Sequence, residues 1–576
     1  MSNNTDVLEK KRVRPVVAGL TPYTGTFGKE QVIHLLKRTM FGAKRADVDF
    51  FTGRTLTQTL DVLFTPAPTP ASGPIRLYAT DVRFDPTLAN DAPANVPYYD
   101  ATPMLGPWAE YRDLGNYNGE RTKSLKSWWI GQMLNQGRSI HEKMVVFWHN
   151  HFATEIVDTT PKTAYYFQEL MRTNALGNLK TLVRDVTFAP NMLIYLNGRL
   201  NKKIAPDENY GRELQELFTV GKGPNSRYTE DDVKAAARIL TGWSYTSVES
   251  PASSGKYVSQ LTFDTSANGH DTGSKQFSAF YSNKVITGSP TANTQANALR
   301  EFNEMLDMIF ATQEVALFIS RKLYRFFVYY DIDATIETDV IAPMADLIRT
   351  NNYDIVPALK ALLSSQHFFD VAQKACWIKS PLDFLVGAAR EFDVAFPTIT
   401  TPSTDAPILY GAWFNIADSA SKQGQNIGDP PNVAGWPAYY QEPMYHETWI
   451  NTDTFPKRLR VTDALLTTTG IVIGGKKLWV DTVKYTDGFG DAIAGDPNLL
   501  IDAVLQLHYR VPPTVAMRTY LKTTILLGGQ ASDHYWTDAW LAYKAAPTNA
   551  AALSLVTTRL QAFYKFLVQN PEYQLS

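Results

Sequence analysis

Apolar residues recur three and four positions apart through most of this chain, which is the spacing of one buried face of an α-helix. In the first half, the pattern predicts helices at about 29–40, from about 122, from 139 to about 152, twice within 163–196, at 206–220 and at 230–240. In the second half, it predicts helices at about 294–310, 312–329, 335–350, 355–364 and 381–392, and a final helix from about 549. We therefore expect a mostly α fold.

Two stretches lack the helical spacing. Between about 244 and 289, Ser, Thr, Gly and aromatic residues alternate, and 257–263 and 277–280 read as short strands. From about 397 to 454, proline and aromatic residues are frequent and no period is visible. The expected architecture is a large multi-helix body with a small β and loop insert at about 250–285 and an irregular, aromatic and proline-rich lid at about 400–455.

The same pattern suggests three parts along the chain. Residues 1–28 are a polar tail punctuated by proline, and 29–455 form the main helical domain, with the insert at 244–289. Residues 456–576 form a C-terminal helical lobe that we expect to pack on the main domain. A stretch rich in Pro, Asp, Asn and Ala at 66–107 predicts a long irregular loop.

The composition limits the classes of function. The 576 residues are 44% hydrophobic, and the formal net charge of −2 creates no field that would attract nucleic acid or an anionic membrane. A single cysteine, Cys376, excludes an intramolecular disulfide. No apolar run is long enough for a membrane-spanning helix or a signal peptide. As written, the chain is expected to be cytoplasmic; the alternative is an exported protein whose leader is absent from this sequence.

One segment, residues 205–221, places polar side chains beside an apolar stripe. Pro206 and Asp207 suit the start of a helix, and Gly221 suits its end. The apolar stripe includes Leu214, and it predicts that one face of this helix is buried.

The polar side chains of this helix converge. At about 100° per residue, Asn209, Glu213 and Glu216 fall on one face, and Arg212 lies one turn from Glu208 and Glu216. Two carboxylates and an amide in such a group can bind a metal ion or act as acid and base. Charged residues at this spacing also occur on ordinary solvated helix faces, and that alternative stays open.

Two histidines, His149 and His151, lie near the end of the helix predicted from residue 139. In a strand they would share one face and could bind one metal ion, whereas in a helix they diverge by about 200°. We interpret the segment as a helix in which His151 points inward. His149, His151 and Glu208 are our candidate ligands for a divalent metal ion, and a hydrogen-bonded core histidine is the alternative.

Several motifs occur in a fixed order along the chain. They are Phe147-Trp148-His149-Asn150-His151-Phe152, the segment 205–221, Leu240-Thr241-Gly242-Trp243, Gly269-His270-Asp271-Thr272-Gly273-Ser274-Lys275 and Pro430-Pro431-Asn432-Val433-Ala434-Gly435-Trp436-Pro437. In order and spacing they resemble the domain-of-unknown-function 1800 family of bacterial proteins, from about His34 to about Arg460. Two positions depart from the family pattern: Asp207 replaces a more usual Asn, and Phe218 replaces a frequent His. The resemblance implies a sulfatase-like partner protein and, in many members, export.

Two of these motifs suggest further site residues. Glycine on both sides of His270 and Asp271 allows close backbone approach, and an adjacent carboxylate can orient or charge an imidazole. A turn stabilised by Asp271 is the alternative, and the resemblance adds Lys275 to the motif. Trp436 suits an aromatic wall over a small-ligand or sugar pocket, or equally a clamp between two helical halves.

Two functions of different class follow. The first is a hydrolase that uses His and Glu as metal ligands or as general acid and base. Its catalytic residues would be Glu213, Glu216, His151, His270 and Asp271. Its substrate-binding residues would be Asn209, Arg212, Lys275 and Trp436. The second is a non-catalytic scaffold or binding protein with a buried Arg, Glu and His network. In the first case, we expect these side chains to line one cavity.

Overall fold

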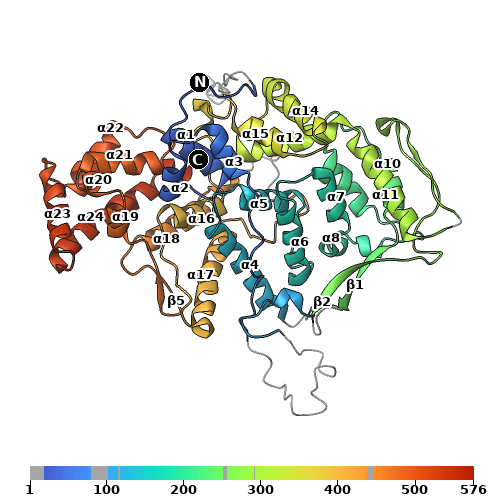
Figure 1. The fold of residues 1–576 in the computed structure, drawn as a ribbon, viewed down its shortest axis with the longest axis horizontal. Helices are drawn as coiled ribbons and strands as arrows, with labels where there is room; N and C mark the ends of the chain where they lie inside the picture. The colour runs from blue at the N-terminus through green and yellow to red at the C-terminus, as the bar shows by residue number, and fades with distance from the viewer. Residues whose placement is uncertain (1–18, 79–101, 114–116, 251–255, 291, 437–446) are drawn as a thin grey trace, which may run out of the picture.

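The structure, a computed structural model, describes residues 19–78, 102–113, 117–250, 256–290, 292–436 and 447–576. Helices dominate these ranges, and the named strands form short antiparallel pairs (Figure 1). The prediction of a mostly α fold with a small β insert is confirmed. Among the described helices, none is long and apolar enough to cross a lipid bilayer.

The helices of the first half match most of the predicted positions. Their bounds are α1 Lys29–Thr39, α2 Arg45–Phe51, α3 Leu56–Leu63, α4 Asn118–Leu134, α5 His141–His151, α6 Pro161–Thr173, α7 Leu179–Thr187, α8 Pro190–Tyr195, α9 Asn209–Glu213 and α10 Glu230–Ile239. The start of α10 is fixed by a capping box in which Thr229 and Asp232 bond each other's backbone N–H groups.

The second half is also helical. Its bounds are α11 Gln295–Phe310, α12 Gln313–Phe327, α13 Ala334–Ile336, α14 Ala342–Thr350, α15 Val356–Leu363, α16 Pro381–Glu391, α17 Pro402–Lys422, α18 Thr454–Leu465, α19 Thr482–Asp487, α20 Asp491–Ala494, α21 Pro497–His508, α22 Val515–Thr519, α23 His534–Ala545 and α24 Ala550–Gln569. The final helix therefore begins where the pattern placed it.

Three antiparallel hairpins make up the β-structure of the described residues. β1 (Trp243–Glu249) pairs with β2 (Tyr257–Phe263), so that Trp243 lies opposite Phe263. β3 (Lys275–Gln276) pairs with β4 (Val285–Ile286), and β5 (Ile471–Ile473) pairs with β6 (Lys476–Leu478). The strand expected at 257–263 is confirmed. The one expected at 277–280 is wrong, because Ala279–Tyr281 form a 3-10 turn between β3 and β4.

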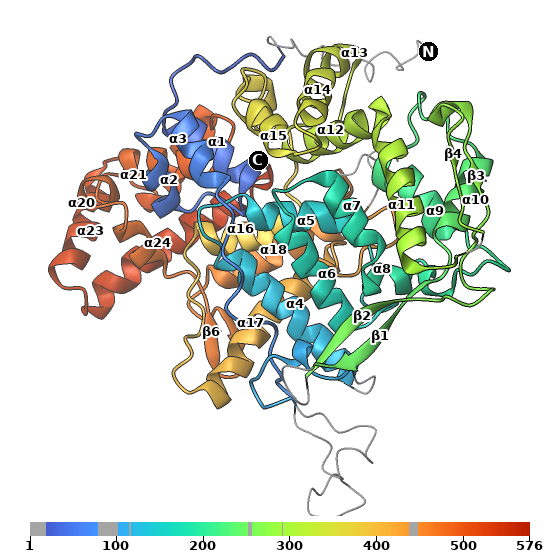
Figure 2. The ribbon, with the colours of Figure 1, turned by 45° about the vertical axis from the view of Figure 1, so that its right-hand side comes forward.

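Helices α4, α5, α16 and α17 lie at the centre of the molecule (Figure 1). Helix α17 packs along α4 and against α16, and α5 packs on α6. In both views, α20, α21, α23 and α24 occupy one end and α10, α11 and the β1–β2 hairpin the other (Figure 2). The C-terminus lies beside α1 in both views.

The segment 373–379 joins α1 to the last residues of the chain. Arg38 on α1 donates from Nη2 to the carbonyl of Gln373 at 3.0 Å. On the other side, Lys379 N donates to the carbonyl of Gln574 at 2.9 Å, and Ser576 N donates to that of Trp377 at 2.9 Å. Side chains that are more than 300 residues apart in the sequence are thereby brought together.

The segment predicted as one α-helix at 206–220 has two parts. After α9, residues Leu214–Thr219 form a π-helix, in which the N–H of Val220 bonds the carbonyl of Gln215 at 2.9 Å. The buried amide of Gln215 stabilises this turn, since it donates to Gly211 O at 3.0 Å and accepts from Tyr281 Oη at 2.8 Å. Gly221 ends the segment with φ of +82°, as predicted.

The expected irregular lid contains a long helix, so this detail of the prediction is wrong. Helix α17 runs through Pro402–Lys422 and includes Pro407. Pro402 stands at the first turn, where its missing N–H has no helical partner in any case. The buried stripe, which includes Leu409 and Ile416, packs the helix against α4. This packing stabilises the helix by more than it loses through the one backbone hydrogen bond that Pro407 cannot donate.

The start of α5 also differs from the expectation. Ser139 and Glu142 have the spacing of a capping box in the sequence, but the helix begins at His141. Glu142 instead forms a buried ion pair with Arg172 at 2.8 Å. The tail at 1–28 and the loop at 66–107 lie partly outside the described residues.

Candidate functional site

Arg212 forms its ion pairs at the protein surface. Its guanidinium donates to both carboxylate oxygens of Glu230 at 2.7 Å and to Glu208 at 3.1 Å. The side chains of Glu208 and Glu230 are 38% and 66% exposed, and Asn209 is exposed as well. Exposed pairs of this kind contribute at most about 1 kcal/mol. Three of the predicted site residues therefore lie on a solvated face.

Glu213 and Glu216 lie close together. Glu216 pairs with Lys222 and accepts a long hydrogen bond from Tyr228 Oη at 3.5 Å. The Oε2 atom of Glu213 is buried and has no hydrogen-bond partner in the described ranges. Burial, and then the charge of Glu216, raise the pKa of Glu213. Among the described residues, no hydrogen bond or ion pair joins either carboxylate to a predicted site histidine.

His270 and Lys275 share the carboxylate of Glu301, a residue on α11 that the sequence analysis did not select. The ammonium of Lys275 donates to Glu301 Oε2, and His270 Nε2 lies 3.5 Å from the same oxygen. The side chains of Lys275 and Glu301 have no exposed surface. On its other side, His270 Nδ1 donates to the carbonyl of Thr241 at 3.0 Å. This buried group fastens β3 to α11.

Asp271 pairs with Arg238 on α10. Its Oδ2 accepts from Arg238 Nε at 2.7 Å, and its Oδ1 accepts from the N–H of Gly273 at 2.8 Å. Burial alone would raise the pKa of Asp271, but these bonds lower it overall. In the motif at 269–275, Asp271 holds a turn through the N–H of Gly273, as the structural alternative expects, and Lys275 forms the buried pair with Glu301.

His151 points into the core from α5. Its Nε2 donates to the carbonyl of Phe218 at 3.1 Å and so joins α5 to the π-helix. Burial, reinforced by the charge of Lys322, holds the pKa of His151 well below its usual value. The imidazole is therefore neutral at physiological pH and has the contacts of a core residue.

His149 lies between two tryptophans. Its ring centre is 5.0 Å from that of Trp129 and 5.6 Å from that of Trp436, and burial lowers the pKa of His149 to about 4. The neighbouring Asn150 accepts a hydrogen bond from the N–H of Trp436 at 2.8 Å. Gly435 permits this contact, since its φ is +92° and a Cβ atom there would lie 2.3 Å from Asn150 Oδ1.

The predicted metal ligands are not gathered into one site. The described part of the chain contains no group of three or more His, Cys, Asp or Glu side chains placed to hold a metal ion. His149 contacts tryptophans, His151 bonds a backbone carbonyl and Glu208 pairs with Arg212 at the surface.

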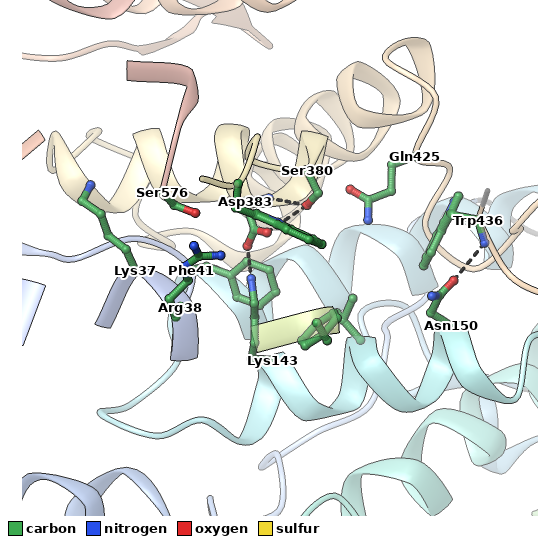
Figure 3. A pocket seen from close by; sticks show the side chains of 13 residues that line it. Lys37, Arg38, Phe41, Lys143, Asn150, Ser380, Asp383, Gln425, Trp436 and Ser576 are labelled. Carbon is green, nitrogen blue, oxygen red and sulfur yellow. Dashed lines mark hydrogen bonds and ion pairs between the residues drawn. The ribbon is translucent and has the colours of Figure 1, made fainter. Parts of the chain in front are cut away.

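A pocket lies between α1, α5, α16 and the loop that follows α17 (Figure 3). Basic, polar and aromatic side chains line it: Lys37, Arg38, Phe41, Lys143, Val146, Asn150, Phe326, Trp377, Ser380, Asp383, Gln425, Trp436 and Ser576. Of the site residues predicted from the sequence, Trp436 alone is among them. We call this the α1–α16 pocket.

Arg38 is the most informative residue of the α1–α16 pocket. Its side chain lies in the pocket wall, and the residue is 3% exposed. Its Nη2 is occupied by the carbonyl of Gln373 and by Cys376 Sγ at 3.2 Å. Its Nε and Nη1 are buried and have no hydrogen-bond partner in the described residues. Such unpartnered donors are rare in native proteins, because a buried charged donor without an acceptor loses its hydration.

Lys143 and Asp383 form an ion pair inside the same pocket. The other oxygen of Asp383 accepts a hydrogen bond from Ser380 Oγ at 3.1 Å, and Ser380 caps α16. Both oxygens of Asp383 therefore have donors within the protein (Figure 3). This carboxylate does not supply the acceptor that Arg38 lacks.

Behind the pocket wall, Glu391 is held between basic groups. Its Oε1 accepts from the ammonium of Lys37 and from the N–H of Ala43 at 3.0 Å, and its Oε2 lies 3.6 Å from His508 Nδ1. Burial would raise the pKa of Glu391, but Lys37 and then Lys379 lower it well below its usual value. Glu391 is therefore a charged partner for two lysines.

Three further basic residues adjoin this group. The Nζ of Lys379 lies 3.9 Å from the ring centre of Tyr573, and burial, followed by the charge of Lys37, lowers the pKa of Lys379 to about 7. Burial likewise lowers the pKa of Arg458 to about 9 and that of Arg510 to about 10. The Nη1 of Arg458 and the Nε of Arg510 are also buried without a partner in the described residues.

Basic groups outnumber acidic ones in and behind the pocket. Counted over the described residues named above, six basic side chains face two carboxylates. The basic members are Lys37, Arg38, Lys143, Lys379, Arg458 and Arg510, and the acidic ones are Asp383 and Glu391. We refer to these eight residues as the cationic cluster. Its surplus of positive charge favours an anion in the α1–α16 pocket.

The cationic cluster was not predicted from the sequence. Lys37 and Arg38 follow the apolar stripe of α1, in a position typical of a solvated helix end. His34, whose place in the sequence suggests a surface or interface residue, is buried as well, and its Nε2 donates to the carbonyl of Phe368 at 3.1 Å. The apolar stripe predicts burial of only one face of α1, whereas every residue from 32 to 39 is buried in the structure.

Comparison with known proteins identifies one related family. The family described as "Protein of unknown function (DUF1800)" matches residues 34–575, nearly the whole chain. No curated protein and no solved structure matches the chain.

Proposed function

We propose that this protein, which belongs to the DUF1800 family, binds a small anionic ligand in the α1–α16 pocket. The description of that family assigns no function. The observation that supports this is Arg38, which lies in the pocket wall with two buried N–H groups that have no acceptor in the described residues. An oxyanion would supply acceptors to both and would balance part of the surplus charge of the cationic cluster.

The hydrolase hypothesis has less support. The residues that it requires take part in separate sets of contacts, at the surface of α9, around Glu301 and between α5 and the π-helix. The alternative of a binding protein with a buried charged network agrees better with these contacts. The network that matters in this proposal is centred on α1 and α16.

Calorimetry with inorganic phosphate tests the proposed function. We expect the full-length protein to bind phosphate at constant ionic strength, and Arg38→Gln to weaken the affinity by about tenfold or more, as for the loss of a charge-assisted hydrogen bond. Arg212→Gln is the matched control, because it removes an arginine that is paired at the surface. Its affinity for phosphate should equal that of the wild type.

Two results would overturn this proposal. One is that phosphate, sulfate and acetate all fail to bind the folded wild-type protein. The other is that Arg38→Gln and Arg212→Gln weaken binding equally, since that would mean a general effect of charge. Thermal unfolding of each variant shows whether it is folded, and Arg38→Lys, which keeps the charge, serves if Arg38→Gln is not.

A further inference from the structure

A second hollow lies at the other end of α16. The α1–α16 pocket contains Ser380 and Asp383 from the start of this helix, whereas residues from its end line a separate cleft. The walls of this cleft come from 389–396, from 134–138 at and after the end of α4, and from 44–47 at the start of α2. Its volume of about 530 Å³ is typical of sites for small ligands. We call it the α4–α16 cleft.

One buried carboxylate, that of Asp47, organises the polar wall of this cleft. Its Oδ1 accepts from Arg138 Nε at 2.9 Å, and its Oδ2 accepts from Arg390 Nη2 at 3.2 Å. At the rim, Lys44 pairs with Asp393 at 2.8 Å. Among the described residues that line the cleft, three basic side chains therefore face two carboxylates. The surplus of one positive charge favours a monovalent anion.

Arg138 holds its guanidinium in a fixed position at this cleft. Asp47 binds its Nε, and its Cζ lies 3.9 Å from the ring centre of Phe50. The outer nitrogens, Nη1 and Nη2, make no hydrogen bond within the described residues, and the side chain is 39% exposed. Two parallel N–H groups at fixed positions bind a carboxylate in a bidentate manner. Arg138 is therefore the part of the cleft that suits a carboxylate.

Two further side chains of the cleft have buried polar atoms without partners. Arg390 is 7% exposed and donates from Nη1 to the carbonyls of Leu134 and Gln136 at 2.8 and 3.3 Å, but its Nε has no acceptor in the described residues. Neither the oxygen nor the nitrogen of the Gln136 side chain has a partner there. An amide offers one acceptor and one kind of donor, and a peptide group in a ligand would match both.

The apolar wall of the cleft is only partly covered. Leu134, Val394 and Phe396 line the cleft and are partly exposed. One side of each packs on the main core, so the other side is open to a ligand. An apolar group bound there would remove this area from water.

We propose that the α4–α16 cleft binds an acylated amino acid, with its carboxylate on Arg138, its amide at Gln136 and its apolar side chain against Val394 and Phe396. The same chemistry occurs in a free acylated amino acid and in the C-terminal residue of a peptide. This site is separate from the α1–α16 pocket, and its ligand is of another class. Either proposal can therefore fail without the other.

Calorimetry with matched probes tests the ligand class. The complete probe is N-acetyl-phenylalanine, and three relatives each lack one feature: N-acetyl-phenylalanine amide lacks the carboxylate, 3-phenylpropionate lacks the amide and N-acetylglycine lacks the apolar side chain. We expect the full-length protein to bind the complete probe at least about tenfold more tightly than each relative. The inference is wrong if the complete probe does not bind, or if any relative binds as tightly.

A longer probe separates the two sources of this chemistry. An acetylated tetrapeptide that ends in phenylalanine carries the same carboxylate, amide and ring. Binding at least as tight as that of N-acetyl-phenylalanine would identify the C-terminal residue of a peptide as the ligand. Weaker binding would identify a free acylated amino acid.

Substitutions of Arg138 test its part in the site. Arg138→Gln should weaken binding of N-acetyl-phenylalanine about tenfold or more, and Arg138→Lys, which keeps the charge without the paired donors, should restore only part of the loss. Arg212→Gln is the matched control, because Arg212 is similarly exposed and also paired with a carboxylate. Arg38→Gln tests whether the probe enters the α1–α16 pocket instead.

Both controls should bind N-acetyl-phenylalanine as the wild type does. Full affinity in Arg138→Gln, or an equal loss in Arg212→Gln or Arg38→Gln, would overturn the assignment. Thermal unfolding shows that each variant is folded. In Arg138→Gln, Asp47 keeps Arg390 as its partner, so we expect the cleft to keep its shape.

Discussion

At the residue scale, burial decides the charge state of several side chains. Lys379 is 5% exposed and adjoins Lys37 and Arg458, and the pKa of its ammonium falls to about 7. His149 and His508, each with a pKa lowered to about 4 by burial, are neutral over the whole physiological range. The protein therefore holds a lysine that titrates near neutral pH directly behind the α1–α16 pocket.

Lys379 makes the stability of the protein depend on pH. Between pH 7 and about 10, the unfolded chain binds the Lys379 proton and the folded protein does not, so stability should rise with pH by up to about 1.4 kcal/mol per unit. Lys379→Met should be more stable than the wild type at pH 7. Its free energy of unfolding should also rise less with pH, because the contribution of Lys379 is gone. Urea unfolding at pH 7, 8 and 9 measures both, and exposed Lys123→Met is the control. Parallel slopes for the wild type and Lys379→Met would contradict the assignment.

Glu213 gives a second prediction from a shifted pKa. The pKa of Glu213 is raised in the folded protein, so its ionisation opposes folding as pH rises through that value. Glu213→Gln should therefore be at least as stable as the wild type at pH 7, and the difference should vanish near pH 4. Thermal unfolding at the two pH values measures this. A loss of about 3 kcal/mol at pH 7 would instead indicate a broken buried ion pair.

At the element scale, a buried ion pair joins the β insert to the helical body. Lys275 on β3 and Glu301 on α11 have no exposed side-chain surface. Glu301→Gln leaves the Lys275 charge without a counterion and should destabilise the protein by about 3 kcal/mol or more. Glu304→Gln, one residue of an exposed pair on the same helix, should change stability by less than about 1 kcal/mol. Urea unfolding that shows equal small effects would mean that the pair does not stabilise the fold.

The sequence predicts most elements of the fold and few of its irregularities. Helices such as α10 are predictable because a cap and an apolar stripe agree. The π-helix at Leu214–Thr219 is not, since it depends on Gln215 bonding Tyr281, a contact over 66 residues. Helix α17 was missed because two prolines resemble loop residues until the packing against α4 is known.

The candidate site was less predictable than the fold. Trp436 was predicted as part of an aromatic wall over a ligand pocket, and its side chain lines the α1–α16 pocket. Arg38 was not selected, because nothing in its local sequence distinguishes it from a solvated residue. Its role depends on which donors remain unpartnered after folding, and that is a property of the tertiary structure.

At the scale of the whole molecule, the α1–α16 pocket lies where distant parts of the chain meet. Helix α1 supplies Arg38, α5 supplies Asn150, and α16 with the loop after α17 supplies Asp383 and Gln425. The last residues of the chain pair with the segment 373–379 beside them. A ligand that bridges these elements would stabilise the whole fold by mass action, with a gain that grows with its concentration.

The most direct test of the central claim is to locate the anion. Crystals of the wild-type protein soaked with selenate should show an anomalous peak within hydrogen-bond distance of Arg38 Nε or Nη1, and crystals of Arg38→Gln treated in the same way should not. Selenate is a tetrahedral oxyanion whose heavy atom can be placed without ambiguity. A peak at other arginines with none at Arg38, or equal peaks in the wild type and the variant, would contradict the account.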